Sequence, residues 1–370
     1  MKLAFVLFKY FPYGGLQRDC IKIARECLQR GHYVDLYCLE WQGPEIPGVN
    51  VHLVKVDVWL NYRRYEVFSQ RVKEQIDTFG YDGVVGFNRM AGLDLYFGAD
   101  PCFALKCEYR KFWYRFLPRS KSFLHAENEV YGLNSSTQLM LLSDHEIPEI
   151  QRLYGTPIER FQMLPPGVDH DRLAPADYLQ QRLEFRHQLE ISDSQKMLLM
   201  VGSGFRTKGV DRALDAMACL PEPHRQNCVL FIVGRDNSAP FERQARQLGL
   251  ERQVRFMGGR DDASKFFFAA DLLIHPAYRE AAGMVLLEAV AAQLPVLVTD
   301  SCGYSFHIER SQAGRVHSSP FDLQRFSREL LEMLEEDSDV RQQAARDYIA
   351  KTDIFGLATT GADVIERVLL

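Results

Sequence analysis

Short apolar runs alternate with amphipathic stretches along most of the chain. Runs rich in Val, Leu, Ile and Phe, such as residues 3–8 and 197–202, end at glycine, proline or polar residues and predict β-strands. The stretches between them, such as 16–30 and 209–219, repeat apolar residues at helical spacing and predict helices. Strands that alternate with helices in this way are typical of βαβ units and parallel sheets.

The predicted strands form two series. The first series is 3–8, 33–38, 51–54, 83–87 and 139–143, and the second is 197–202, 229–234, 254–258, 272–276 and 295–299. Predicted helices include 16–30, 62–79, 209–219, 240–248 and 283–293. Because the same succession occurs twice, we predict an α/β fold of two doubly wound, Rossmann-like domains.

A Pro-Pro-Gly sequence at 165–167 interrupts the pattern between the two series. Neither proline can donate a hydrogen bond to a sheet, and the residue before a proline is biased away from helix. We therefore predict an N-terminal domain at 1–166 and a C-terminal domain at 167–350. Residues 351–370 have a helical pattern with no strand after it, and we expect this helix to return to the N-terminal domain.

The composition is that of an ordinary soluble globular protein, with 46% hydrophobic and 25% charged residues. A net charge of −5 gives no whole-chain basis for binding nucleic acid. The eight cysteines are scattered, without a CxxC motif or zinc-ligand spacing, which indicates free thiols in a reducing cytoplasm and no structural metal. Lys9 interrupts the first apolar run, which indicates a strand rather than a signal peptide, and no run is long enough to cross a bilayer.

Open parallel sheets bind ligands at the carboxyl ends of their strands, so the loops there are the candidates for chemistry. After the first strand, "KYFPYGGLQRD" places Gly14 and Gly15 before a helix whose first turn holds Asp19. Paired glycines allow the backbone to approach a ligand closely, and a helix N-terminus favours an anion. The alternative is a plain βα turn in which Asp19 complements the helix dipole.

The loop "VGSGFRTKGVDR" at 201–212 follows a strong strand and places Arg206 and Lys208 at the start of a helix, among three glycines. It is not a Walker A sequence, because Lys208 precedes Gly209 instead of following it. Glycines and a cation at a helix N-terminus suit a diphosphate, and these cations would neutralise charge on a departing phosphate. The alternative is a solvated basic turn.

The stretch 277–297, "AYREAAGMVLLEAVAAQLPVL", is apolar on nearly every side yet carries Glu280 and Glu288. A buried carboxylate needs hydrogen-bond donors, and it can accept from two neighbouring hydroxyls, which suits a ribose at Glu288 and a hexose at Glu280. The helix start presents the backbone N–H groups of Ala282, Gly283 and Met284 to the sugar or its phosphate. The alternative is a core glutamate paired with an arginine, and an exposed glutamate in the loop.

These features together resemble the retaining glycosyltransferases of family 4, which have the GT-B fold. The resemblance rests on the E-x7-E pair Glu280/Glu288 after "LIHPA", the Gly-Gly loop after the first strand, the "LPPG" linker and the Lys208 loop. Three stretches, "FKYFPYGGLQRD", "VVGFNRMAGLDLYFGAD" and "HPAYREAAGMVLLEA", are similar to the bacterial glucosyltransferases of the lipopolysaccharide core. The resemblance covers essentially the whole chain.

The resemblance implies transfer of a sugar from a UDP-sugar to an inner-core heptose of lipopolysaccharide, with retention at the anomeric carbon. It implies no metal and no other cofactor. Two Rossmann-like domains would face each other across a cleft, with the donor held mainly by the second domain and the acceptor by the first. The sugar is glucose or an N-acetylhexosamine such as GlcNAc or GalNAc, which motifs do not distinguish.

Roles in the C-terminal domain follow from the same resemblance. Glu288 would bind the ribose, Glu280 the transferred sugar and Lys208 the diphosphate. Arg172, just after the linker, is a candidate for the phosphate, and Arg260 in "GGRDD" is a candidate for the uracil edge. The family also implies a front-face mechanism in which the leaving phosphate assists the acceptor.

In the N-terminal domain, the resemblance places Gly14 and Gly15 close to the phosphate, and Asp19 would help to position or deprotonate the acceptor hydroxyl. One departure from the family concerns Ser203, because many members have an arginine directly after the strand glycine. Neutralisation of the phosphate would then fall to the other cations, Arg206 included.

Three other polar positions have simpler interpretations. The Asp-His-Asp sequence at 169–171 matches the D-x-D metal signature of another glycosyltransferase fold. Acidic residues commonly begin turns at such a linker, so we predict no metal there. His275 and His307 are interpreted as satisfied polar groups rather than ligands.

Residues 102–123, "CFALKCEYRKFWYRFLPRSKSF", form an aromatic-basic segment in an otherwise acidic protein. Such a segment suits an anionic membrane surface, and the resembled family, whose acceptor is anchored in the inner membrane, favours this interpretation. Single-stranded nucleic acid could use similar residues, but nothing else in the chain supports it. The alternative is a solvated helix whose rings pack inward.

The sequence thus predicts a cytoplasmic, UDP-sugar-dependent glycosyltransferase that is peripheral on the inner membrane. Two other functions stay open. A UDP-N-acetylhexosamine epimerase would keep the fold and turn over the donor without an acceptor. A lipopolysaccharide- or membrane-binding protein would have no activity at all.

Overall fold

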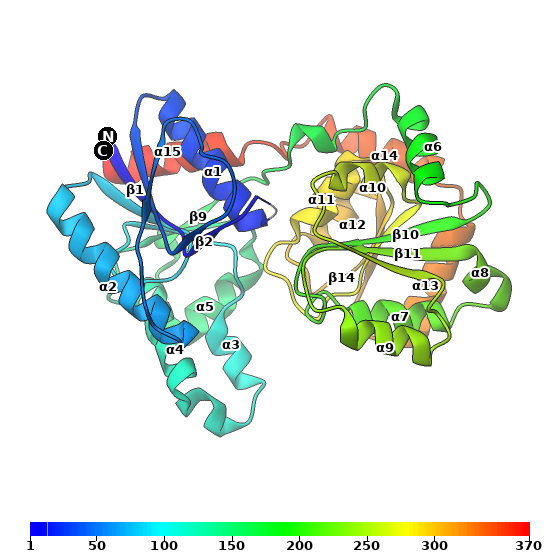
Figure 1. The fold of residues 1–370 in the computed structure, drawn as a ribbon, viewed down its shortest axis with the longest axis horizontal. Helices are drawn as coiled ribbons and strands as arrows, with labels where there is room; N and C mark the ends of the chain where they lie inside the picture. The colour runs from blue at the N-terminus through cyan, green and yellow to red at the C-terminus, as the bar shows by residue number, and fades with distance from the viewer. Residues whose placement is uncertain (13) are drawn as a thin grey trace. The chain divides into compact units, whose positions relative to one another are not determined.

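Two parallel β-sheets, one in each of two units, account for the alternating apolar pattern (Figure 1). The computed structural model describes residues 1–12 and 14–370. The N-terminal unit contains Met1–Gly167 and Gly356–Leu370, and the C-terminal unit contains Val168–Phe355. Each unit has its own buried apolar core.

The N-terminal unit is built on a seven-stranded sheet in the order β5-β3-β1-β6-β7-β8-β9, with β2 and β4 paired separately. Its strands are β1 (Lys2–Val6), β2 (Lys9–Tyr10), β3 (Tyr33–Cys38), β4 (Glu40–Trp41), β5 (Val49–Leu53), β6 (Gly83–Gly86), β7 (Leu95–Gly98), β8 (Gln138–Leu141) and β9 (Phe161–Met163). Its helices are α1 (Gly15–Gln29), α2 (Asn61–Phe79), α3 (Phe103–Glu108), α4 (Pro118–Tyr131), α5 (Ile147–Tyr154) and α15 (Leu357–Leu369). Three short 3-10 turns are η1 (Phe112–Phe116), η2 (Asp144–Glu146) and η3 (Ile158–Arg160).

The C-terminal unit is built on a six-stranded sheet in the order β12-β11-β10-β13-β14-β15. Its strands are β10 (Lys196–Val201), β11 (Cys228–Val233), β12 (Val254–Gly258), β13 (Leu272–His275), β14 (Val296–Thr299) and β15 (Gly314–His317). Its helices are α6 (Tyr178–Gln188), α7 (Val210–Ala218), α8 (Glu222–Asn227), α9 (Ala239–Gln247), α10 (Ala263–Ala269), α11 (Met284–Ala291), α12 (Ser305–Ser311), α13 (Leu323–Glu335) and α14 (Asp339–Ile349), and its 3-10 turn is η4 (His170–Arg172).

Both sheets follow the doubly wound order, in which the chain starts at a central strand, builds to one edge and then fills the other side. A parallel strand covered on both faces needs apolar side chains at successive positions, and β11 is buried at every residue. Figure 1 shows α7 and α9 on one side of the C-terminal sheet and α10 and α14 on the other. The predicted fold class is therefore confirmed.

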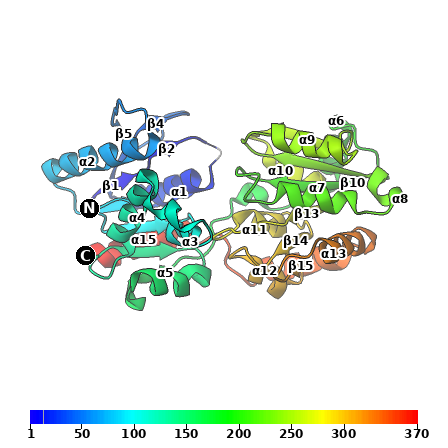
Figure 2. The same ribbon diagram turned by 90° about the horizontal axis from the view of Figure 1, so that it is seen from below.

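The helix α15 packs against α1 within the N-terminal unit, and the two lie side by side in Figures 1 and 2. A Cβ at Gly361 would lie 3.1 Å from the side chain of Ile23, so the two helices approach closely. Ion pairs from Arg30 to Asp363 at 2.6 Å and to Glu366 at 2.9 Å tie the same helices together. The last helix is therefore part of the N-terminal unit.

The boundaries of the units differ from the predicted ones by a few residues. The first segment of the N-terminal unit ends at Gly167 rather than 166, and the C-terminal unit extends to Phe355 rather than 350. Residues after 350 stay in the C-terminal unit because Ile354 is fully buried and its carbonyl accepts from the N–H of Val168 at 2.9 Å. The ring of Phe355 also stacks on His170, with ring centres 4.5 Å apart.

The pattern of apolar positions misses three strands of the main sheets, namely β7, β9 and β15. A polar side chain interrupts two of them, Gln162 in β9 and Arg315 in β15, whereas β7 is an apolar run like those that were predicted. Among residues 1–12 and 14–370, none of the helices combines the length and the apolar character that a bilayer crossing requires.

Candidate active site

The candidate site lies where the C-terminal sheet changes direction. Strand β10 lies between β11 and β13, so the chain builds one side of the sheet from β10 and the other side from β13. Open parallel sheets bind ligands at such a switch point, beyond the carboxyl ends of the two strands. The loops there are 202–209 and 276–283, and they contain Lys208 and Glu280.

Backbone contacts join these two loops. The N–H of Tyr278 donates to the carbonyl of Thr207 at 2.8 Å. Gly209 has a φ of +75°, and a Cβ there would lie 2.1 Å from the carbonyl oxygen of Pro276. Glycine is required at this position, because a side chain would push the two loops apart. Gly209 therefore sets the distance between the loop of Lys208 and the loop of Glu280.

Side chains of α7 brace the second loop. The guanidinium of Arg212 donates to the carbonyls of Pro276 at 3.3 Å and Ala277 at 3.1 Å, and it lies 3.6 Å from the ring centre of Tyr278. The hydroxyl of Tyr278 donates to Asp211 at 2.8 Å. Because α7 begins directly after the first loop, the helix fixes both loops together.

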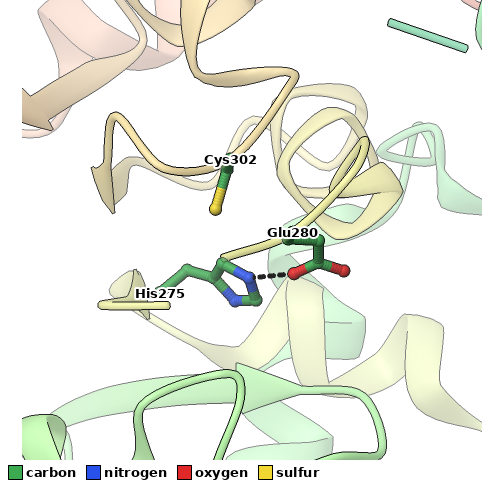
Figure 3. Close-up of side chains that lie close together, drawn as sticks. All are labelled: His275, Glu280 and Cys302. Atoms are coloured by element: carbon green, nitrogen blue, oxygen red, sulfur yellow. Dashed lines mark hydrogen bonds and ion pairs between the residues drawn. The ribbon is translucent and has the colours of Figure 1, made fainter. Parts of the chain in front are cut away.

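Two donors from different elements hold the carboxylate of Glu280. Lys208 Nζ donates to Oε1 at 2.7 Å, and His275 Nε2 lies 2.5 Å from Oε2 (Figure 3). The side chain of Glu280 keeps 23% of its surface exposed, whereas His275 is fully buried. The carboxylate is therefore fixed in orientation and still accessible to a ligand.

The two donors, Lys208 and His275, keep the Glu280 carboxylate charged. Burial alone would raise the pKa of Glu280, but the charge of Lys208 and the contact with His275 outweigh burial and hold that pKa well below its usual range. An ionised carboxylate is an acceptor with two lone pairs on each oxygen. Glu280 can therefore accept hydrogen bonds from ligand hydroxyls in addition to its two protein donors.

The backbone of Glu280 is paired with the loop after β14. It forms a parallel bridge with Cys302, in which its N–H donates to the carbonyl of Ser301 at 3.0 Å and its carbonyl accepts from the N–H of Gly303 at 3.1 Å. The sulfur of Cys302 points toward His275 and Glu280 in Figure 3. The bridge explains how Cys302, from the loop after β14, joins the site.

Ligand atoms of His275, Glu280 and Cys302 lie within 4.8 Å of one another, an arrangement that could hold a metal ion. The sequence did not predict this cluster. Burial, together with the charge of Glu280, raises the pKa of the Cys302 thiol well above its usual range. The ammonium of Lys208 already neutralises Glu280. Both effects favour a protonated thiol and a lysine–glutamate pair over a bound cation.

The predicted apolar helix after this loop is confirmed as α11. Gly283 is its N-cap with a φ of +93°, Met284 is its first residue, and the rest of the helix is buried, Glu288 included. Glu280 and Ala282 precede the cap, so the two glutamates do not lie on one continuous helix. Glu280 belongs to the switch-point loops and Glu288 belongs to the buried helix.

Glu288 contacts Arg172, which was a candidate for the phosphate. Arg172 Nε lies 3.4 Å from Glu288 Oε1, its Nη1 donates to Asp171 at 2.8 Å, and both Arg172 and Glu288 are buried. The alternative to sugar binding expected a core glutamate paired with an arginine, and Glu288 with Arg172 confirms that half. The other half, an exposed glutamate in the loop, is wrong because only 23% of the Glu280 side chain is exposed. A ribose at Glu288 would share the carboxylate with Arg172.

Three further candidates in the C-terminal unit have exposed side chains. Ser203 Oγ accepts a hydrogen bond from the N–H of Arg235 at 3.3 Å, which links the loops after β10 and β11. Arg206 lies in the loop of Lys208. Arg260 forms a two-point ion pair with Asp262, with both contacts at 2.8 Å. Their roles toward a donor stay predictions.

The candidates of the N-terminal unit surround the start of α1. Gly14 is the N-cap, Gly15 is the first residue, and Asp19 follows in the second turn with 7% of its surface exposed. Within the described residues, a Cβ at Gly15 would meet nothing within 4 Å. The first turn of α1, residues 15–18, contains no acidic residue. Asp19 therefore lies one residue beyond the first turn, in which the sequence had placed it, and its role stays a prediction.

The histidines divide into two cases. His307 is a satisfied polar group as predicted, because its Nδ1 lies 2.5 Å from the hydroxyl of Tyr348. The interpretation of His275 missed its contact with Glu280, because a lone histidine at a strand end carries no spacing signal. The Asp-His-Asp sequence leads into η4, where Asp171 pairs with Arg172.

The aromatic-basic segment is a broken helix with exposed rings. It runs through α3, η1 and the start of α4. Exposed fractions are 80% for Tyr109, 79% for Phe112, 49% for Trp113 and 58% for Phe116. The cations are also exposed, and they are Lys106, Arg110, Lys111, Arg115, Arg119 and Lys121. The alternative of a helix whose rings pack inward is therefore wrong for these four rings.

A buried carboxylate anchors the beginning of this segment. Glu127 of α4 is fully buried and accepts hydrogen bonds from the N–H groups of Phe103 at 2.5 Å and Ala104 at 2.8 Å. Arg89 pairs with the same carboxylate at 2.9 Å. The first turn of α3 is therefore fixed to the core while the rings that follow it stay exposed.

Comparison with known proteins agrees with this architecture. A family model described as Glycosyltransferase Family 4 matches residues 13–172, and one described as Glycosyl transferases group 1 matches residues 181–351. The chain is 42% identical over 369 residues to the lipopolysaccharide glucosyltransferase WaaG of Escherichia coli strain K12, with 99% of this chain and 98% of that protein covered.

Solved structures show the same fold. A crystal structure of WaaG aligns with a TM-score of 0.95 at 41% identity, covering 98% of this chain and 99% of that chain. Anabaena Alr3699/HepE in complex with UDP and glucose aligns with a TM-score of 0.76 at 16% identity, covering 99% of this chain and 100% of that chain. The chain therefore belongs to glycosyltransferase family 4, has the GT-B fold of two Rossmann-like domains, and is a glycosyltransferase.

Proposed function

We propose that this enzyme transfers a hexose from a UDP-sugar to an inner-core heptose of lipopolysaccharide, with retention at the anomeric carbon and without a metal. The observation that carries the proposal is the clamped, accessible carboxylate of Glu280 beside Lys208 at the switch point of the C-terminal sheet. Similarity to WaaG, a lipopolysaccharide glucosyltransferase, supports the acceptor class and makes UDP-glucose the first donor to test.

The charges at the switch point suit the departure of a nucleoside diphosphate. Negative charge grows on the phosphate as its bond to the sugar breaks, and the ammonium of Lys208 would stabilise that charge. Glu280 would accept hydrogen bonds from the sugar hydroxyls and fix the ring. Lys208 now donates to Glu280, so donor binding would make the lysine serve the carboxylate and the diphosphate together.

Retention requires that the acceptor hydroxyl enter on the face from which the phosphate leaves. The hydroxyl oxygen forms the new bond to the anomeric carbon, the bond to the phosphate breaks, and the leaving phosphate takes the proton of the hydroxyl. Asp19 in α1 would orient that hydroxyl. No protein nucleophile is needed in this scheme.

Transfer with purified protein tests the proposal. UDP-glucose and heptose-terminated lipopolysaccharide are supplied in a buffer with EDTA, and both UDP release and the mass of the acceptor are measured. We expect UDP release that depends on the acceptor, and a gain of one hexose on the lipopolysaccharide. UDP-galactose, UDP-GlcNAc and UDP-GalNAc, supplied separately, identify the donor.

The same assay separates the two other functions. An epimerase would convert the donor without any acceptor, and no acceptor would gain mass. A binding protein would retain lipopolysaccharide without consuming any donor. Either result would contradict the proposed transfer.

We also propose that the enzyme binds the cytoplasmic face of the inner membrane through the aromatic-basic segment. The support is the exposure of four rings and six cations in one segment whose start is fixed to the core. Aromatic rings favour the interface between headgroups and chains, and each cation near an anionic surface contributes about 1 kcal/mol. The enzyme would then reach its membrane-anchored acceptor from the membrane surface.

Co-sedimentation with vesicles of phosphatidylglycerol and phosphatidylethanolamine tests this binding. The test variant is Lys111→Glu/Arg115→Glu/Arg119→Glu, and the control variant is Arg243→Glu/Arg246→Glu/Arg252→Glu in the C-terminal unit. All six arginines and lysines are exposed. Removal of three favourable cations should weaken binding by about 100-fold. Equal binding of the two variants would contradict the role of the segment.

A further inference from the structure

His275 is the last residue of β13 and is fully buried. Its Nε2 lies 2.5 Å from Glu280 Oε2, and its Nδ1 has no hydrogen-bond partner within residues 1–12 and 14–370. A proton on Nδ1 would be buried without an acceptor, and a bare Nε2 would face a carboxylate oxygen. The hydrogen of the imidazole is therefore on Nε2, from which it is donated to Glu280.

His275 and Lys208 are donors of different kinds. The ammonium of Lys208 is at the end of a flexible side chain in a loop, and its three N–H groups can be shared between partners. The imidazole of His275 is a short, rigid ring on a buried strand, and it offers a single N–H in one direction. A diphosphate that binds Lys208 would weaken the hold of the lysine on Glu280. His275 would then be the donor that keeps the carboxylate in place.

We propose that His275 is a positioning residue, which fixes the Glu280 carboxylate for the hydroxyls of the transferred sugar while Lys208 is shared with the diphosphate. The inference rests on the proposed function, which assigns the sugar to Glu280. This role of His275 predicts a result that a purely structural histidine would not give. Loss of the Nε2 hydrogen bond weakens binding of the sugar part of the donor and leaves binding of UDP unchanged.

Two polar substitutions separate the hydrogen bond from the space that the ring fills. In His275→Gln, the side-chain amide reaches about as far as Nε2 and can still donate to Oε2. In His275→Asn, the amide ends near the position of Nδ1 and cannot reach Glu280. His307→Asn is the matched control, because His307 is a buried imidazole of the same unit that bonds to Tyr348.

Calorimetric titration with UDP and with UDP-glucose, together with steady-state kinetics, measures the effect. His275→Asn should weaken UDP-glucose binding by about tenfold or more and lower kcat, with UDP binding within about twofold of wild type. His275→Gln should recover most of the loss, and the control should change neither ligand. In a Glu280→Gln background, His275→Asn should have no further effect, because the two residues act as one pair.

The outcomes separate this role from the proposed function. Wild-type protein that binds neither UDP nor UDP-glucose would refute the proposed function and, with it, the role of His275. Wild-type protein that binds UDP-glucose, with a His275→Asn variant that binds it equally well, would refute the role of His275 alone. Equal losses for UDP and UDP-glucose, or equal losses in the Asn and Gln variants, would also overturn it.

Discussion

Replacement of Gly209 with alanine tests the junction between the two loops of the site. Gly209 has a φ of +75°, a conformation that costs an L-residue about 1–2 kcal/mol. The new Cβ would lie 2.1 Å from the carbonyl oxygen of Pro276, a backbone atom that cannot swing aside as a side chain can. Displacement of one loop adds about 1–3 kcal/mol, so we expect a total loss of about 2–5 kcal/mol.

Gly204→Ala is the matched control, since Gly204 has a φ of +79° in the same loop. A Cβ there would meet no atom of the described residues within 4 Å, so only the conformational cost applies. For a domain the size of Val168–Phe355, each 1 kcal/mol lowers Tm by about 2–4 °C. We therefore expect Gly209→Ala to melt about 2–12 °C below the control.

The assay is thermal unfolding followed by far-UV circular dichroism, with both variants at the same protein concentration. A Tm for Gly209→Ala equal to that of Gly204→Ala would refute the reasoning, because it would mean that the two loops do not meet at this glycine. A larger loss in Gly209→Ala supports the junction that brings Lys208 to Glu280.

Further predictions concern charge and pH. Glu280→Gln should lower kcat/KM for UDP-glucose by about 10–100-fold in steady-state kinetics, because charge-assisted hydrogen bonds contribute about 1.5–3 kcal/mol. Lys208→Met should weaken binding of UDP itself in calorimetric titration, whereas Glu280→Gln should leave it nearly unchanged. Burial, with the charge of Arg310, lowers the pKa of His307 to about 4, so the unfolded chain binds this proton more readily than the folded chain. The stability that neutral His307 contributes is full above about pH 6.5 and falls as the pH drops toward 4, by at most about 3 kcal/mol. Denaturant unfolding across this range should show a smaller loss in His307→Asn than in wild type, and equal losses would contradict the lowered pKa.

The sequence pattern predicts most of the central strands because burial on both faces demands uninterrupted apolar residues. Strands such as β10 and β11 therefore stand out along the chain. The four residues of β15, Gly-Arg-Val-His, contain a glycine and two polar side chains, so they carry no such signal. Short outer strands of this kind are defined by their neighbours in the sheet rather than by their own composition.

The residues of the site also differ in how well the sequence predicts them. Lys208 and Glu280 could be predicted together because each follows a strand whose carboxyl end lies at one edge of the sheet. His275 and Cys302 could not, because their approach depends on a side-chain rotamer and on a backbone bridge to another loop. The pairing of Arg172 with Glu288, 116 residues apart, likewise has no local signal.

A crystal structure of the enzyme with UDP-glucose is the most direct test of the claim that the donor binds at the switch point of the C-terminal sheet. We predict a diphosphate oxygen within hydrogen-bond distance of Lys208 Nζ, a sugar hydroxyl on Glu280, and His275 Nε2 still on Oε2. A donor bound elsewhere, or bound with Glu280 turned away from the sugar, would contradict this claim.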